Sequence, residues 1–196
     1  MRDTAVVTEI ACGRAALIPD GERGAVLFFA AEAASTSLLA FAIRHSSGLI
    51  HAAMRPDRLD LLRIHDQPVL ASEDGALGFT VSVDAVGTGT GISGQDRART
   101  LRVLGSRQTV PGDLVRPGHV LPVRCPHVPR TAREVVWDRL LGIVERAGCT
   151  PVAAACRLVH DSGDVLDDSA AIRFAAIHGI AVVSVRPRVR MLAAGA

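Results

Sequence analysis

A glycine- and threonine-rich turn is the densest run of residues that could bind a small anion. It reads Gly-Thr-Gly-Thr-Gly-Ile-Ser over residues 87–93 and leads to Asp96 and Arg97. A turn that runs into a helix presents backbone N–H groups and hydroxyls to an anion. The spacing matches neither a P-loop nor a dinucleotide-binding fingerprint. The turn therefore indicates either an anion site or a tight connection between a strand and a helix.

A lone histidine, His119, follows a Pro-Gly turn at the start of a β-rich run. Histidine titrates close to neutral pH, so it is the usual side chain for proton transfer. At this place it is either a proton-transfer residue or a structural one, and the sequence leaves both interpretations open. The four cysteines have no Cys-x-x-Cys spacing and predict reduced, mostly buried thiols.

Short β-rich runs alternate with helical runs, which favours a layered fold of helices on a sheet. The expected strands cover residues 25–30, 49–54, 79–85, 119–124, 152–159 and 181–185. The expected helices cover residues 35–44, 95–104, 132–147 and 168–178. Four signals mark helix boundaries, namely capping boxes at Ser93/Asp96 and Thr131/Glu134 and C-terminal glycines at Gly148 and Gly179.

The composition excludes several classes of protein. The 196 residues include 22 basic and 20 acidic ones, mixed along the chain, so no basic block predicts nucleic-acid binding. The apolar runs are too short to span a membrane, and the N-terminus lacks the layout of a signal peptide. All basic residues are arginine, which excludes a Schiff-base lysine. A single cytoplasmic domain over residues 1–196 is expected, with a flexible tail over residues 186–196.

Several runs taken together resemble the 3,4-dihydroxy-2-butanone 4-phosphate synthases of riboflavin biosynthesis. The matching runs lie within residues 29–32, 44–50, 58–60, 79–85, 88–97 and 116–124. The resemblance covers residues 14–185 and implies an α+β fold, a three-layer α/β/α sandwich around a mixed sheet. It also implies a small-molecule substrate and a homodimer with active sites near the interface. The family converts ribulose 5-phosphate into formate and a four-carbon phosphoketone, with magnesium stabilising an enediolate.

When the family's site residues are carried over position by position, the resemblance implies that this chain keeps only some of them. The matching residues are Glu22, Thr90, Asp96, Arg97, His119 and Arg133. Other family positions carry different residues in this chain. Val26 and Arg157 stand where the family has two proton-transfer carboxylates, and Val136 stands where it has a metal-binding histidine. Trp137 and Asp138 occupy the next two family positions, and His51 stands where the family has a cysteine. Glu22 is thus the only retained metal ligand. Because one carboxylate holds magnesium poorly, no cofactor is expected.

The preferred hypothesis is a repurposed, metal-independent enzyme of lyase or isomerase type. It would act on a small carbonyl metabolite by proton transfer, elimination, isomerisation or cyclisation, in specialised metabolism. Its predicted catalytic residues are Glu22, His51, His119 and Asp138, and its predicted substrate-binding residues are Thr90, Arg133, Val136, Trp137 and Arg157. Two alternatives stay open: a pseudoenzyme that serves as a binding or regulatory dimer, and a slow synthase that uses Glu22 and His51 as its metal pair.

Some of these residues also have purely structural interpretations. Asp96 can be a helix cap, and Trp137 can be a core residue at helical spacing from Leu140. Arg157 can be a salt-bridge partner of Glu22 or Asp138 across an emptied metal site, where its charge would replace that of the metal.

Overall fold

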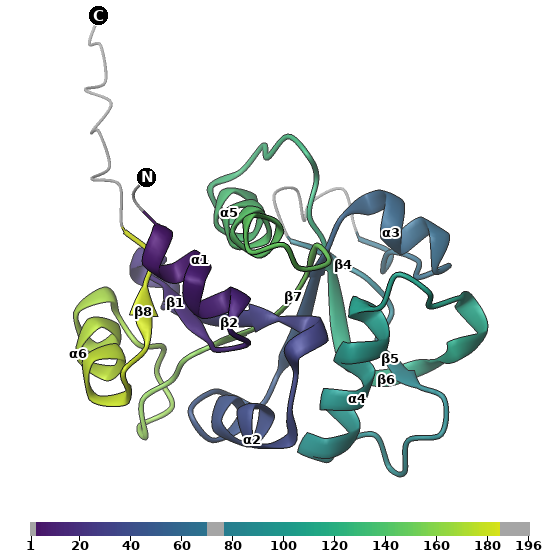
Figure 1. Cartoon of the computed structure of the whole chain (residues 1–196), viewed down its shortest axis with the longest axis horizontal. Coiled ribbons are helices and arrows are strands. Elements are labelled where there is room, and N and C mark those ends of the chain that lie inside the picture. Colours follow the sequence, from purple (N-terminus) through teal and green to yellow (C-terminus); the bar gives the residue numbers. More distant parts are fainter. Residues whose placement is uncertain (1–2, 70–76, 185–196) are drawn as a thin grey trace, which may run out of the picture.

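The computed structural model describes residues 3–69 and 77–184 (Figure 1). A mixed sheet lies between two layers of helices, which confirms the predicted three-layer α+β sandwich. The strand order is β4-β6-β3-β7-β2-β1-β8, and β5 pairs with β6 beside this path. Residue 185 of the last predicted strand and the predicted tail lie outside the described residues. A single domain over the whole chain stays a prediction.

The strands are β1 (Ala16–Ile18), β2 (Val26–Ala30), β3 (Ile50–Met54), β4 (Gly78–Phe79), β5 (Val83–Ala85), β6 (Leu114–Arg124), β7 (Val152–Arg157) and β8 (Ala181–Val182). The pairs β3–β6 and β1–β8 are parallel, and the other pairs are antiparallel. Every residue of the central strands β2 and β3 is buried, because helices cover both faces of the sheet.

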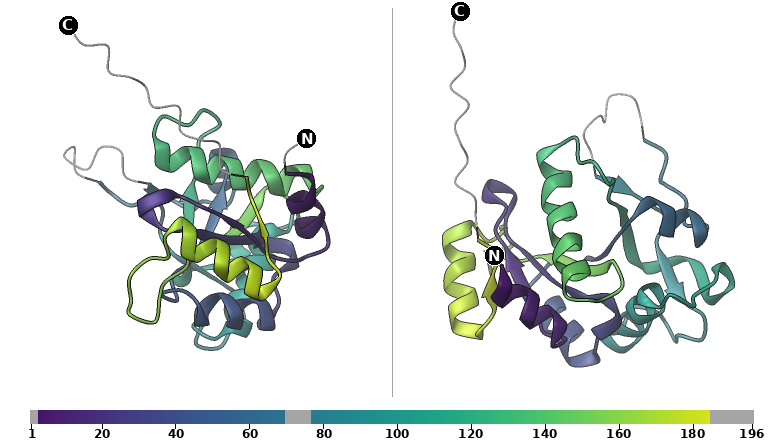
Figure 2. Two further views of the ribbon diagram at one scale, coloured as in Figure 1. Left: turned by 90° about the vertical axis from the view of Figure 1, so that its left-hand side faces the viewer. Right: turned by 45° about the horizontal axis from the view of Figure 1, so that its top comes forward.

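The helices are α1 (Thr4–Ala11), α2 (Thr36–Arg44), α3 (Pro56–Leu61), α4 (Gly94–Gly105), α5 (Ala132–Arg146) and α6 (Asp168–His178). Buried side chains of α1 and α5 form one apolar cluster with the sheet, and those of α2, α3, α4 and α6 form the other. The left view of Figure 2 shows the sheet between α5 above and α2 below. None of the helices in the described ranges is long and apolar enough to cross a membrane.

The predicted strand over residues 79–85 is wrong in one respect, because it is split into β4 and β5. Between them, Thr80 donates its N–H to the carbonyl of Pro122, and β5 then pairs with β6 through a register shift after Val83. The chain also contains α1, β1 and α3, for which the sequence pattern raised no expectation. Short elements of this kind are fixed by packing more than by their own propensity.

Candidate active site

Three of the predicted site residues meet at one end of the sheet, on the face covered by α5. Arg157, at the end of β7, lies opposite Val26 of β2, and His51 of β3 lies opposite Ala155 of β7. The imidazole of His51 meets the indole of Trp137 on α5 edge to face, with ring centroids 5.4 Å apart. Histidine, arginine and tryptophan side chains from three elements therefore gather here.

The guanidinium of Arg157 is held by an acidic loop. Its Nη2 donates to Oδ2 of Asp20 over 2.9 Å, and its Nη1 donates to the carbonyls of Arg23 and Gly24 over 2.7 Å each. Arg23 donates to the same carboxylate. A salt bridge of Arg157 was expected, but its partner is Asp20 rather than Glu22 or Asp138. Asp20 escaped the sequence reasoning because its burial depends on the packing of this loop.

His51 is buried between two aromatic rings. It stacks on Phe79 at a centroid distance of 5.7 Å, and its Nδ1 is buried with no hydrogen-bond partner. Burial, and after it the positive charge of Arg157, lower the pKa of His51 to about 4. The imidazole is therefore neutral at pH 7, and it can donate or accept a hydrogen bond without carrying a charge.

Trp137 is a core residue of α5, as its structural interpretation predicted, and it also forms a wall of the site. It is fully buried, packs in the same apolar cluster as Leu140, and its indole Nε1 has no hydrogen-bond partner. Val136 packs against this cluster as well. The two residues make this wall of the site dry and apolar.

Two predicted catalytic residues do not join this group. The carboxylate of Asp138 accepts a hydrogen bond from Nη1 of Arg55 over 2.7 Å, and Arg55 follows the far end of β3 from His51. Glu22 is exposed on the short 3₁₀ helix η1 (Gly21–Arg23), where the described residues offer it no ion-pair partner. Neither carboxylate forms a hydrogen bond or an ion pair with His51 among the described residues.

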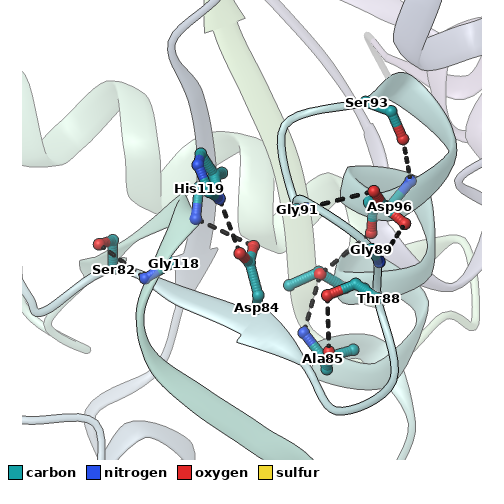
Figure 3. Close-up of polar contacts among 11 residues, drawn as sticks. Ser82, Asp84, Ala85, Thr88, Gly89, Gly91, Ser93, Asp96, Gly118 and His119 are labelled. Atoms are coloured by element: carbon teal, nitrogen blue, oxygen red, sulfur yellow. Dashed lines mark hydrogen bonds and ion pairs between the residues drawn. The ribbon is translucent and has the colours of Figure 1, made fainter.

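The glycine- and threonine-rich loop satisfies its own N–H groups (Figure 3). The carboxylate of Asp96 accepts hydrogen bonds from the N–H of Gly89 over 3.3 Å and of Gly91 over 3.2 Å. The interpretation as an anion site therefore loses two of its donors. The predicted capping box is half formed: Ser93 Oγ accepts from the N–H of Asp96, but the Asp96 side chain turns to the loop. Thr90 is exposed on this loop.

The capping box at the start of α5 is confirmed. Thr131 Oγ1 accepts from the N–H of Glu134, and the Glu134 carboxylate accepts from the N–H of Thr131. Arg133 lies exposed in this first turn, and no hydrogen-bond partner is seen for it among residues 3–69 and 77–184. Its guanidinium is therefore available to solvent and to a small anion.

His119 and Asp84 form a second polar group, drawn in Figure 3. The carboxylate of Asp84 accepts from the backbone N–H of His119 over 2.9 Å and lies 2.7 Å from Nδ1 of its ring. Since a carboxylate only accepts, Nδ1 donates and Nε2 is left to take up a proton. His119 lies two residues before Leu121, the strand partner of His51, and thus about 7 Å along β6 from that position.

Two glycines make room for this pair. A Cβ on Gly91 would lie 2.5 Å from Nδ1 of His119 and closer still to Oδ2 of Asp84. A Cβ on Gly118 would overlap the backbone of Val83. Asp84 was not among the predicted site residues, although it stands in one of the runs that carried the family resemblance. The structure identifies it as the residue that orients His119.

The side chains at this end of the sheet do not fit a magnesium site. Among the described residues there is no group of three or more His, Cys, Asp or Glu side chains that could hold a metal ion. Both oxygens of Asp20 are engaged by guanidinium groups, which leaves the exposed Glu22 as the only carboxylate of residues 20–24 without an ion-pair partner in the described part of the chain. Magnesium binds through several oxygen ligands, so no step of a reaction is assigned to it here.

Comparisons with known proteins agree with the observed fold and identify the family. The sequence pattern of the 3,4-dihydroxy-2-butanone 4-phosphate synthase family matches residues 4–190. Riboflavin biosynthesis protein RibBA of Salinispora arenicola is 34% identical over 91% of this chain, and so is RibBA of Mycobacterium tuberculosis. The chain spans 44% of the length of each of these relatives.

Solved structures of 3,4-dihydroxy-2-butanone 4-phosphate synthases also match this chain. A 3,4-dihydroxy-2-butanone 4-phosphate synthase in complex with two magnesium ions matches with a TM-score of 0.84 and 31% identity, over 91% of this chain and 90% of that one. The synthase of Candida albicans matches with a TM-score of 0.82 and 29% identity, over 93% of both chains.

These matches correct the preferred hypothesis from the sequence. A repurposed enzyme of specialised metabolism is contradicted, because the relatives are named for riboflavin biosynthesis and the matching structures are synthases. The expectation that no cofactor binds also stands against a similar structure that holds two magnesium ions. From residue 4 to residue 190, this chain belongs to the 3,4-dihydroxy-2-butanone 4-phosphate synthase family.

Proposed function

We propose that this chain acts as a 3,4-dihydroxy-2-butanone 4-phosphate synthase in riboflavin biosynthesis. The RibBA relatives and the matching synthase structures support the proposal. Because the chain spans less than half of the RibBA proteins, the proposal concerns only the synthase reaction. The single observation that carries it in the structure is the Asp84–His119 pair, which supplies an oriented proton-transfer group within the family's own sequence runs.

In the proposed reaction, His119 moves protons at its Nε2 while Asp84 holds the ring. Asp84 fixes the tautomer of the imidazole and stabilises the protonated form that arises when Nε2 takes up a proton. The side chain of His119 is 39% exposed, so a small substrate can reach it. We assign the phosphate group of ribulose 5-phosphate to the exposed guanidinium of Arg133, since arginine binds phosphate with paired N–H donors.

A bacterial strain that lacks its own synthase and needs added riboflavin tests this function in cells. The chain is expected to restore growth without riboflavin, and the His119→Ala variant is not. His127→Ala is a matched control, because His127 is exposed and stands outside the pair. If the unaltered chain is expressed in folded form and growth still requires riboflavin, the proposal is wrong.

A further inference from the structure

A surface pocket beside helix α4 contains none of the residues of the two groups described above. Helix α4 packs against β5 (Figure 1), and the pocket opens between the C-terminal half of this helix, the end of β5 and residues 106–113. Its volume of about 670 Å³ is in the range of small-molecule sites. We propose that this pocket binds a small organic phosphate of the nucleotide type, with two arginines of α4 holding its phosphate groups.

Backbone carbonyls fix the two guanidinium groups that line the pocket. Arg99 donates from Nη1 to the carbonyl of Gly87 over 2.8 Å and from Nη2 to that of Val86 over 2.9 Å. Arg102 donates from Nη1 to the carbonyl of Ala34 over 2.6 Å. Gly87 leaves room for the first contact, because a Cβ there would lie 3.2 Å from Nη2 of Arg99. Since both guanidinium groups are already ordered, binding a ligand costs little additional side-chain entropy.

Both arginines keep N–H donors for a ligand. Arg99 uses two N–H groups of its guanidinium in these bonds and Arg102 uses one, which leaves the other donors of each group. Among the residues that the structure describes, no carboxylate forms an ion pair with either group. The two arginines are three residues apart on α4, so their side chains lie on one face of the helix. Guanidinium groups in this arrangement bind phosphate oxygens through charge-assisted hydrogen bonds.

The charges around the pocket favour an anion. Two guanidinium groups and one carboxylate, that of Asp113, line it. The next charged residues outward are three arginines and three acids, which balance one another: Arg58, Arg107, Arg116, Glu32, Asp57 and Asp96. The carboxylate of Asp96 is already engaged by the N–H groups of the loop before α4. A net charge of about +1 therefore remains at the pocket.

The remaining lining groups match the other parts of a nucleotide. Val86 is exposed and Val103 is half-buried, so they offer an apolar surface to a ring. Oδ2 of Asp113 accepts from the N–H of Val110 over 2.9 Å, which leaves Oδ1 to accept from the hydroxyl groups of a sugar. Gln108 adds an exposed amide that can both donate and accept. Phosphate, sugar and ring each have a matching group in one pocket.

Calorimetric titration with adenosine diphosphate (ADP) tests the proposal, and adenosine is the matching probe without phosphate. ADP is expected to bind at one site per chain with a Kd below about 1 mM, whereas adenosine is expected to bind at least about 10-fold more weakly. The His119→Ala variant is expected to bind ADP as the unaltered chain does. The titration measures no turnover, so this proposal and the proposed synthase function can fail separately.

Four variants locate the ADP. Gln108→Glu adds a negative charge to the pocket while both arginines and their carbonyl contacts stay, and it is expected to weaken ADP binding by about 10-fold. Ser162→Glu is the matched control, because it adds the same charge at an exposed residue outside the pocket. Arg102→Gln is also expected to weaken ADP binding by about 10-fold or more. Arg133→Gln is expected to leave it unchanged, because Arg133 does not line this pocket.

Three results would overturn the proposal. The first is an unaltered, folded protein that binds no ADP or binds adenosine equally well. The second is a Kd for ADP that neither Gln108→Glu nor Arg102→Gln changes. The third is a loss of ADP binding in Arg133→Gln, which would place the ADP at the start of α5 instead.

Discussion

The Asp84–His119 pair shows how a residue outside the predicted set can decide what a predicted one does. Replacing Asp84 by asparagine keeps the shape of the side chain but offers an amide where Nδ1 of His119 now meets a carboxylate. We expect kcat to fall by about 10- to 100-fold with little change in KM, because the protonated imidazole loses its partner. Steady-state kinetics beside Ser82→Ala check this, since Ser82 binds the neighbouring Gly118 N–H instead. An equal fall for both variants would contradict the orienting role of Asp84.

The buried His51 should make stability depend on pH. Its pKa in the folded chain is about 4, below the ordinary value of 6.5, so the unfolded chain binds more protons between these two values. The free energy of unfolding should therefore fall as the pH drops through this window. From pH 7.5 to pH 5 the contribution of His51 is about 2 kcal/mol. Urea unfolding of the His51→Gln variant should show a loss smaller by this amount, and equal losses would contradict the burial of a neutral ring.

Individual residues show which parts of the site the sequence could predict. His51, Trp137 and Arg157 were selected as site residues from the family's positions, and the structure brings their side chains to the same end of the sheet. Glu22 was chosen on the same grounds, yet it is exposed. Asp20 was overlooked, although it is the carboxylate that binds Arg157. The sequence alignment gives a position along the loop, but it does not give the direction in which the loop turns its side chains.

At the scale of elements, the loop before α4 depends on one glycine. Gly91 has a φ of +81°, and a Cβ there would press into the Asp84–His119 pair. The Gly91→Ala variant should lose about 1–3 kcal/mol of stability and most of its activity. Gly112→Ala is a matched control, because nothing lies within 4 Å of its added Cβ. Thermal unfolding followed by circular dichroism measures both, and a Tm for Gly91→Ala equal to that of the control would contradict this geometry.

Elements with complete local signals were predicted well, and elements shaped by distant contacts were not. The expected helix over residues 35–44 matches α2, and α5 starts at its predicted Thr131 capping box. Helix α3 starts with Pro56 in its first turn, a signal that sequence reasoning did not use. The break between β4 and β5 has no local signal, because it depends on how residues 80–84 pair with β6, where the register shifts after Val83.

At the scale of the whole molecule, the predicted homodimer remains a proposal. Leu49 and Ile92 are 50% and 54% exposed, and a hydrogen bond from Arg97 to the carbonyl of Gly48 joins the helix that follows Ile92 to the residue before Leu49. Light scattering should give a mass of twice 20.6 kDa for the unaltered chain. Ile92→Arg should shift it towards the monomer, whereas Val128→Arg, at another exposed apolar residue, should not. A monomer at micromolar concentration would contradict the dimer.

The whole fold follows the family closely, whereas the differences at one end of the sheet remain a prediction from the resemblance in sequence. The fold matches a magnesium-bound synthase with a TM-score of 0.84, whereas the resemblance in sequence places Arg157 and Val26 where the family is expected to have carboxylates. A shared fold does not by itself fix the chemistry of a site, so the reaction has to be measured.

Proton NMR of the purified protein with ribulose 5-phosphate and magnesium measures the reaction most directly, because formate gives a single sharp resonance. We predict that formate accumulates in proportion to enzyme concentration, and that the His119→Ala variant is slower by about 100-fold or more. If the folded, unaltered protein leaves ribulose 5-phosphate intact and releases no formate, the proposed synthase function is wrong.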